Sequence, residues 1–203
     1  MGISKGNLYD DAFKRERLLS YLGLGTYARK LQIVNLTPAQ YKKFAVDHHL
    51  QGYATASVKL GLIDKSGNIK AMMSFSPSRY ANTQWELIRY CSDGTVVGGA
   101  SKLFSHFIAQ YSPDTVVSYA NRNWSQGNLY RALGFTDTTT DVKNTSTWYF
   151  KRYTRYHRSS LTKKRLVDMG FDPTKTADQI LDEEGFLKVF DYGNWRFTWQ
   201  RSS

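Results

Sequence analysis

The sequence predicts an α/β fold with a small basic appendage at its C-terminal end. The chain has 203 residues, which suits one domain of ordinary size with an addition. Hydrophobic residues make up 41% of it, enough for a packed core, so a disordered chain is excluded. Strand and helix signals follow one another along most of the chain.

The first part of the chain predicts a helix, a strand and a second helix. Residues 10–22 read as a basic amphipathic helix within an N-terminal helical extension, residues 1–26. Residues 31–35 alternate between apolar and polar side chains like a strand. A threonine N-cap and an N1 proline then open a helix over residues 39–46.

The middle of the chain predicts a hairpin followed by a strand and a long helix. Residues 57–63 and 69–76 read as strands separated by a turn cluster that contains glycine, which indicates an antiparallel hairpin. Residues 85–91 form another strand. A glycine-containing loop then leads into a helix over residues 101–111, whose apolar residues recur at helical spacing.

The remaining elements are shorter. A strand over residues 115–119 precedes a short helix over residues 127–133, and residues 146–150 are strand-like. A capping box opens a helix over residues 176–184. The aromatic residues of 189–199, with a central glycine, predict a closing hairpin.

Positive charge is concentrated where the main domain, residues 27–158, meets the appendage, residues 159–203. The formal net charge is +11. Residues 151–165 contain seven Lys or Arg and no acid, whereas residues 166–191 contain seven acids and two lysines. Clustered cations with aromatic residues between them are typical of a nucleic-acid contact, so we expect duplex DNA as a partner; a solvated basic loop is the alternative. The candidate DNA-binding residues of this segment are Lys151, Arg152, Arg155, Arg158, Lys163, Lys164 and Arg165.

Other classes of protein are excluded by what the sequence lacks. No apolar run of about 18 residues and no signal-peptide core occur, so we expect no membrane partner and a cytoplasmic location. The single cysteine, Cys91, excludes an internal disulfide and a multi-cysteine zinc site. His48 and His49 are adjacent and lack the i, i+4 spacing of a two-histidine metal site, so we expect no metal.

The glycine loop ahead of the helix over residues 101–111 is the first candidate site. Backbone N–H groups at a helix N-terminus, together with the helix dipole, can hold phosphates. The loop has neither P-loop nor dinucleotide-binding spacing, so nucleotide hydrolysis and hydride transfer are not predicted. A tight turn without a ligand is the alternative. The candidate cofactor-binding residues are Val97, Gly98, Gly99, Ala100, Ser101 and Lys102.

The order of elements and the segment NLYRALGF, residues 128–135, resemble the GCN5-related N-acetyltransferase (GNAT) superfamily. The resemblance implies a mixed, mostly antiparallel sheet flanked by helices, with acetyl-CoA or a related acyl-CoA bound at the glycine loop. It places Tyr130 as the general acid that protonates the leaving thiolate; a core aromatic is the alternative. Gly98 and Ala100 match the family's pyrophosphate-binding pattern, and Thr95 stands where that pattern has Arg or Gln.

A closer resemblance covers roughly residues 27–199, in the blocks YARK, HHLQGY, VVGGASKLFSHFI, SYANRNWSQGNLYRALGF, RYHRSSLTKKRL and FDYGNWRFTW. These blocks look like the GNAT-like domain of phage proteins classed as homing endonucleases or Hef-like proteins, often found behind a separate nuclease domain. The residues ahead of YARK hold no carboxylate cluster, so we expect the companion domain alone, acting in an infected bacterium. A weaker similarity is to the phage Mom family, GNAT-like enzymes that alter adenine in DNA.

Two further groups of polar residues are candidate contacts. His49 lies in HHLQGY, where a near-neutral imidazole suits a general base; a histidine that caps the preceding helix is the alternative. Asn121, Arg122 and Asn123 follow the strand over residues 115–119, in a loop position that could hold a base or a phosphate.

Two functions therefore remain open. The first is a DNA-binding transferase that modifies nucleic acid with an acyl-CoA-type donor. The second is a DNA-recognition module without catalytic activity. A nuclease is less well supported, because the sequence contains no H-N-H, GIY-YIG or paired-carboxylate signature that can be placed.

Overall fold

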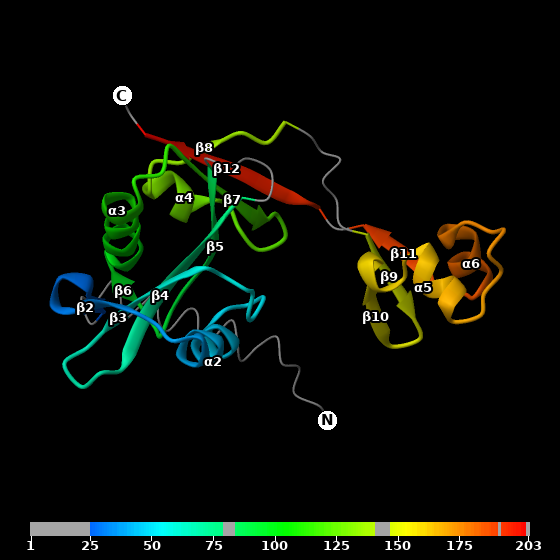
Figure 1. Ribbon diagram of the computed structural model, residues 1–203, viewed down its shortest axis with the longest axis horizontal. Coiled ribbons are helices and arrows are strands. Elements are labelled where there is room, and N and C mark those ends of the chain that lie inside the picture. Colours follow the sequence, from blue (N-terminus) through cyan, green and yellow to red (C-terminus); the bar gives the residue numbers. More distant parts are fainter. Residues whose placement is uncertain (1–24, 79–83, 141–146, 191, 202–203) are drawn as a thin grey trace. The chain divides into compact units, whose positions relative to one another are not determined.

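The computed structural model describes residues 25–78, 84–140, 147–190 and 192–201 and contains two compact units (Figure 1). The large unit comprises Met1–Ser118, Asn128–Thr136 and Phe197–Ser203, and the small unit comprises Tyr119–Gly127 and Asp137–Arg196. The domain boundaries expected from the sequence, after residues 26 and 158, stay a prediction. The helix expected over residues 10–22 lies outside the described residues.

A seven-stranded mixed sheet, in the order β2-β3-β4-β5-β7-β12-β8, organises the large unit. Its strands are β2 (Gln32–Asn35), β3 (Val58–Ile63), β4 (Ile69–Pro77), β5 (Gln84–Ser92), β7 (Thr115–Asn121), β8 (Thr136–Asp137) and β12 (Asn194–Gln200). Strands β2 to β5 pair antiparallel, whereas β5 and β7 pair parallel. The expected α/β class, with a mostly antiparallel mixed sheet flanked by helices, is therefore confirmed. Strands β7 and β12 each continue from the large unit into the small unit.

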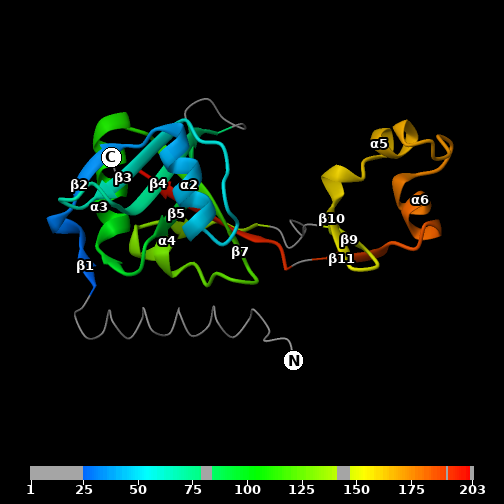
Figure 2. The same cartoon turned by 90° about the horizontal axis from the view of Figure 1, so that it is seen from below.

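Two helices, α2 (Pro38–His48) and α3 (Gly99–Tyr111), cover opposite faces of this sheet (Figures 1 and 2). Adjacent residues of β4 show the alternation. The Ser74 hydroxyl lies 3.1 Å from the Tyr41 hydroxyl of α2, whereas the Phe75 ring stacks on Phe107 of α3 at a centroid distance of 3.6 Å. Because neighbouring strand residues point to opposite faces, β4 is buried on both sides.

The helix starts follow from local sequence. The Thr37 side chain accepts the Gln40 N–H and the Gln40 side chain accepts the Thr37 N–H, which is a capping box ahead of an N1 proline. Helix α3 begins at Gly99, two residues earlier than expected, because Gly98 is its N-cap in the left-handed conformation with φ of 74°. A short helix, α4 (Asn128–Ala132), confirms the one expected ahead of Gly134.

A short parallel pairing lies beside the glycine loop. Strand β1 (Thr26–Tyr27) pairs with β6 (Val96–Val97) and leads into the 3₁₀ helix η1 (Ala28–Lys30). The Thr26 N–H donates to the carbonyl of Thr95, at the start of the loop. The chain around residues 26–30 therefore borders the glycine loop.

The small unit contains a three-stranded antiparallel sheet in the order β10-β9-β11 and three short helical segments. These elements are β9 (Thr147–Lys151), β10 (Thr154–His157), η2 (Arg158–Ser160), α5 (Lys163–Asp168), α6 (Ala177–Glu183) and β11 (Leu187–Phe190). The expected capping box at Thr176 and Gln179 is confirmed at the start of α6. The core of this unit is formed by Tyr149, Leu161, Leu166, Ile180 and Leu181.

The hairpin expected over residues 189–199 is wrong. Strand β11 pairs with β9, whereas β12 belongs to the seven-stranded sheet. The pairing partners lie far away in the sequence, and the aromatic Phe197 of β12 is fully buried against Tyr130 in the large unit. Alternating aromatic residues indicate strands but not which strand each one pairs with.

Among the described residues, no helix is long and apolar enough to cross a membrane.

Candidate functional site

Two hydroxyl groups, those of Ser118 and Tyr130, lie next to the end of the parallel pairing between β5 and β7. Its last backbone pair joins Glu86 and Val117. At the next residue, the Ser118 hydroxyl donates to the carbonyl of Leu87 at 2.8 Å and lies 3.2 Å from the Tyr130 hydroxyl. The Ser118 side chain thus forms the next hydrogen bond between β7 and β5 after the backbone pairs end. The same hydroxyl positions the Tyr130 hydroxyl.

Tyr130 has a ring that packs in the core and a hydroxyl that is protonated, so its position is compatible with both a core aromatic and a general acid. Its ring packs in the core, stacked on Phe197 at 4.7 Å and edge-on to Phe135 at 5.8 Å. Burial raises the pKa of its hydroxyl, and the Ser118 hydrogen bond and the charge of Arg89 oppose that rise in part. At neutral pH the phenol is therefore protonated and can serve as a proton donor.

Arg89 is a functional candidate that our sequence reasoning missed. A β-bulge at Ile88 of β5 shifts the register of β4 and β5, so that Ser74 pairs with Arg89 while Phe75 pairs with Leu87. Bulges of this kind redirect side chains and are frequent beside active sites. The available signal was a charged residue that interrupts an apolar run.

The guanidinium of Arg89 lies half-buried and donates to two backbone carbonyls. Its Nε donates to the Gly52 carbonyl at 3.3 Å and its NH1 to the Ile88 carbonyl at 2.9 Å. Burial lowers its pKa, and the nearby Tyr41 and Tyr130 hydroxyls raise it in part. Within the described part of the chain no acid forms an ion pair with it, and Glu86 is its acidic electrostatic neighbour.

His49 is the C-cap residue of α2, and its N–H donates to the Ala45 carbonyl at 3.0 Å. Its Nδ1 accepts the Gln51 N–H at 3.1 Å. Burial, followed by the charge of Arg89, lowers the pKa of the imidazole to about 4, so the ring is neutral at pH 7. Because Nδ1 accepts a hydrogen bond, the ring hydrogen is on Nε2, and a base role requires that His49 give up the Gln51 bond. Both proposed catalytic residues, His49 and Tyr130, have Arg89 as an electrostatic neighbour.

The glycine loop is tightly packed. A Cβ on Gly99 would lie 2.9 Å from Cγ1 of Val96 and 3.0 Å from the Tyr90 hydroxyl, so only glycine fits without movement of the neighbours. The Tyr90 hydroxyl accepts the backbone N–H of Ala100, and burial raises the pKa of this phenol to about 12. The neutral Tyr90 side chain thus already accepts the Ala100 N–H, one of the backbone donors at the start of α3.

The ammonium of Lys102, expected to bind a cofactor phosphate, is hydrogen-bonded to the protein backbone instead. It donates to the carbonyls of Ala28 at 2.9 Å and Leu31 at 2.6 Å, which fastens α3 to the segment that follows β1. The backbone–backbone hydrogen bonds outside regular helices and strands include none from the N–H groups of Gly99 and Ser101 in the described chain. Phosphate binding by this loop stays a prediction.

In the small unit, the predicted basic segment spreads over the β9–β10 hairpin, η2 and α5. Lys151 pairs with Glu184 at 3.0 Å. Six other cations are exposed and form no ion pair within the described chain, although Lys163 is an electrostatic neighbour of Asp172. We call this group the cationic surface: Arg152, Arg155, Arg158, Lys163, Lys164 and Arg165.

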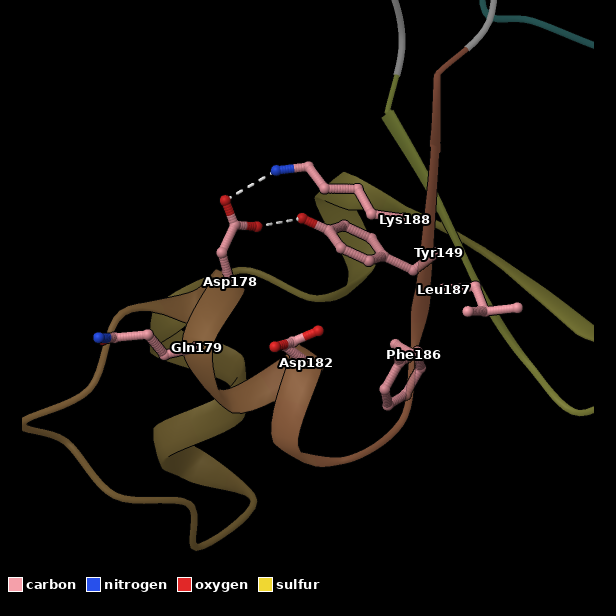
Figure 3. A pocket seen from close by; sticks show the side chains of 7 residues that line it. All are labelled: Tyr149, Asp178, Gln179, Asp182, Phe186, Leu187 and Lys188. Carbon is pink, nitrogen blue, oxygen red and sulfur yellow. Dashed lines mark hydrogen bonds and ion pairs between the residues drawn. The ribbon is translucent and has the colours of Figure 1, made fainter.

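A group of acids lies on α6 and at its C-cap: Asp178, Asp182, Glu183 and Glu184. Asp178 pairs with Lys188 at 2.7 Å and Glu183 with Lys175 at 2.7 Å. Asp178 also accepts the Tyr149 hydroxyl at 2.5 Å, and these groups border a pocket of about 410 Å³ (Figure 3). The Asp182 carboxylate lines the same pocket, which makes it unsuitable for a phosphate group.

Asn121 and Arg122, at the end of β7 and in the loop after it, contact other residues of the protein. Asn121 Oδ1 accepts the Asn123 N–H at 2.8 Å, and the Arg122 guanidinium lies 4.1 Å above the Trp195 ring. Arg122 Nε is buried and has no hydrogen-bond partner among the described groups. Asn123 is the exposed residue of the three.

The described residues contain no group of three or more His, Cys, Asp or Glu that could hold a metal ion.

Comparison with solved structures finds acetyltransferases. The Bacillus subtilis acetyltransferase in complex with CoA aligns with 85% of this chain and 100% of its own, at 10% identity and a TM-score of 0.49. The ribosomal-protein-S18-alanine N-acetyltransferase from Escherichia coli aligns with 85% of this chain and 95% of its own, at 12% identity and a TM-score of 0.49. A GNAT family acetyltransferase from Elizabethkingia anophelis with acetyl-CoA bound covers 85% and 99%, at 13% identity and a TM-score of 0.46. No family model and no curated protein matches the chain.

Proposed function

We propose that the protein binds duplex DNA through the cationic surface of the small unit and transfers an acyl group, at Tyr130 of the large unit, to a nucleic-acid acceptor. The observation that carries DNA binding is the set of six exposed cations that form no ion pair in the described chain. Such cations bind phosphates and release counterions from the duplex, which favours binding irrespective of base sequence.

The distribution of ion pairs supports this assignment. Lysines 151, 175 and 188 neutralise acids on or next to α6, so those acids do not offset the cationic surface. The guanidinium of Arg155 lies 4.3 Å above the Trp148 ring, which holds the cation in place while it remains exposed. The small unit therefore presents ordered positive charge.

The transfer step is supported by the groups around Tyr130. An acyl-CoA, when bound, supplies an acyl thioester and a thiolate leaving group. The N–H groups of Gly99 and Ser101 would bind one of its phosphates. The neutral His49 imidazole would take the proton that the acceptor loses, and the protonated Tyr130 hydroxyl would give a proton to the departing sulfur. Arg89 binds an anionic group of the acceptor, for which a nucleic-acid phosphate is suitable. The resemblance to phage homing-endonuclease-associated domains and to the Mom family is the reason to propose a DNA acceptor.

A second function, DNA recognition without chemistry, is favoured by the state of the glycine loop. The Tyr90 hydroxyl already holds the Ala100 N–H, and Lys102 is bound to two carbonyls. Thr95 stands where the GNAT pattern has a longer polar side chain. These features weaken a phosphate site and leave the DNA-binding surface untouched.

Calorimetry of the full chain with duplex DNA and with acetyl-CoA, in separate titrations, tests both functions. Heat from both ligands, together with release of free thiol when the two are mixed with the protein, supports the transferase. Heat from DNA alone supports the recognition module. Absence of heat from DNA at low salt contradicts both.

A further inference from the structure

The β9–β10 hairpin ends in a two-residue loop. Lys151 and Thr154 are the last strand pair, so Arg152 and Tyr153 form the tip. Arg152 has a φ of 55°, and a positive φ at the first loop residue is the pattern of a type II′ turn, which normally places glycine there. A side chain in this conformation is strained by roughly 1 kcal/mol.

Tyr153 is fully exposed, at 104% of its reference surface. Within the described chain its ring stacks on no other ring and lies under no cation, unlike Trp148 and Tyr149 of the adjoining strand. An exposed aromatic ring forgoes the burial that normally stabilises such a residue. The tip thus carries two unfavourable features, a strained arginine and an unburied ring.

The charges around the ring identify a class of partner. Lys151, Arg152 and Arg155 lie within two residues of Tyr153, and no acid occurs between residues 151 and 165. A polyanion with planar aromatic groups, that is, a nucleic acid, matches both the charges and the ring. An apolar or acidic protein surface would match only one of them.

We propose that Tyr153 stacks on an unpaired nucleobase of the bound DNA, while Arg152 and Arg155 bind the flanking phosphates. The proposal rests on the DNA binding proposed above and adds the structure that is recognised. In a continuous duplex, the faces of internal bases are covered by their neighbours, so a ring at a hairpin tip can stack only on a base that is bulged, flipped or single-stranded. The hairpin therefore distinguishes an interrupted duplex from a continuous one.

The test uses the full chain and two short duplexes that differ by one nucleotide. One contains a bulged 2-aminopurine, and the other contains the same fluorescent base in a pair. Stacking on one base by an aromatic side chain gives about 5- to 150-fold in affinity, so we expect the wild type to prefer the bulged duplex by this factor and to quench its emission. Tyr153→Ala should abolish the preference and the quenching, and Tyr153→Phe should keep both, because the ring remains.

The control is Tyr192→Ala, which removes another exposed tyrosine of the small unit. This variant should behave like the wild type on both duplexes. Equal affinity of the wild type for the two duplexes, or a preference that survives in Tyr153→Ala, overturns the inference and leaves DNA binding intact. Failure of the wild type to bind either duplex at low salt overturns the proposed function together with the inference.

Discussion

The hydroxyl of Tyr90 on β5 accepts the backbone N–H of Ala100 in the first turn of α3. The helix N-terminus is the place where an anion is stabilised by free amides and by the helix dipole. Burial raises the pKa of this phenol to about 12, so its acceptor is a neutral oxygen that an incoming phosphate could replace. The same strand also carries Arg89, so β5 contributes to both candidate ligand contacts of the large unit.

Tyr90→Phe should make acetyl-CoA bind about 5-fold more tightly, because it frees one amide donor for a phosphate, a gain of about 1 kcal/mol. Without ligand, the free energy of unfolding should fall by about 1 kcal/mol, since the Ala100 N–H loses its partner. Calorimetry and urea unfolding measure the two effects. Tyr53→Phe, which removes the hydroxyl of a half-exposed tyrosine elsewhere in this unit, is the control. Unchanged affinity in Tyr90→Phe would show that the Ala100 amide does not contact the cofactor.

Tyr130→Phe should lower turnover by about 10²- to 10⁴-fold with little change in acetyl-CoA affinity, because it removes the proton donor and keeps the ring. The stacking on Phe197 persists, so the unfolding free energy should fall by only about 1 kcal/mol. Thiol release under saturating donor is the measurement. Phe135→Leu, which changes the packing of the ring but not the hydroxyl, is the matched control. Full activity in Tyr130→Phe would assign Tyr130 to the core alone.

The stability of the protein should depend on pH through His49. Its pKa is lowered to about 4 in the folded state, so the unfolded chain takes up a proton first as the pH falls. The stabilisation is complete above about pH 6.5 and is lost toward pH 4, by about 1 to 2 kcal/mol when allowance is made for partial exposure. His49→Gln should remove this part of the pH dependence in chemical unfolding, whereas His48→Gln, at the exposed neighbouring position, should not. A profile that is the same in wild type and His49→Gln would contradict the burial of this ring.

Replacing Arg155, Arg158, Lys163 and Lys164 with Gln should flatten the dependence of log affinity for duplex DNA on log salt by up to about 3 to 4 units. Each phosphate contact contributes about 0.9 to this slope, and such contacts do not read base sequence. A variant with the same change in charge on the large unit, at Arg29, Lys30, Lys42 and Lys65, is the control. Titrations of both variants with duplex DNA at several salt concentrations measure the two slopes. Equal slopes in the two variants would show that the cationic surface is only solvated.

Elements with local signals were predicted well. The N-cap at Thr37 with its N1 proline and the capping box at Thr176 each involve residues within three positions, so a short window contains the cause of each helix start. The hairpin of β3 and β4 is likewise local, because its turn lies between its strands. Such features need no knowledge of the rest of the fold.

Features that depend on distant residues were missed. The pairing of β11 with β9 and the burial of Phe197 beside Tyr130 result from contacts across the fold, which alternation alone does not encode. Arg89 was missed because its placement depends on a bulge between two strands. Lys102 was expected to face a phosphate, since a lysine in a glycine loop commonly does, but its two carbonyl partners come from about 70 residues earlier in the chain.

The two ends of the segment from Thr138 to Arg196 are hydrogen-bonded to each other. The Thr138 N–H donates to the Arg196 carbonyl at 2.8 Å, and the Arg196 N–H donates to the Thr139 hydroxyl at 2.9 Å, although the two ends are 58 residues apart. Chain ends that meet in this way let a module be excised and the gap closed by a tight turn, at a modest cost in loop entropy. We therefore expect that the segment between these ends, which contains β9, β10 and β11, can be grafted into a loop of an unrelated host protein.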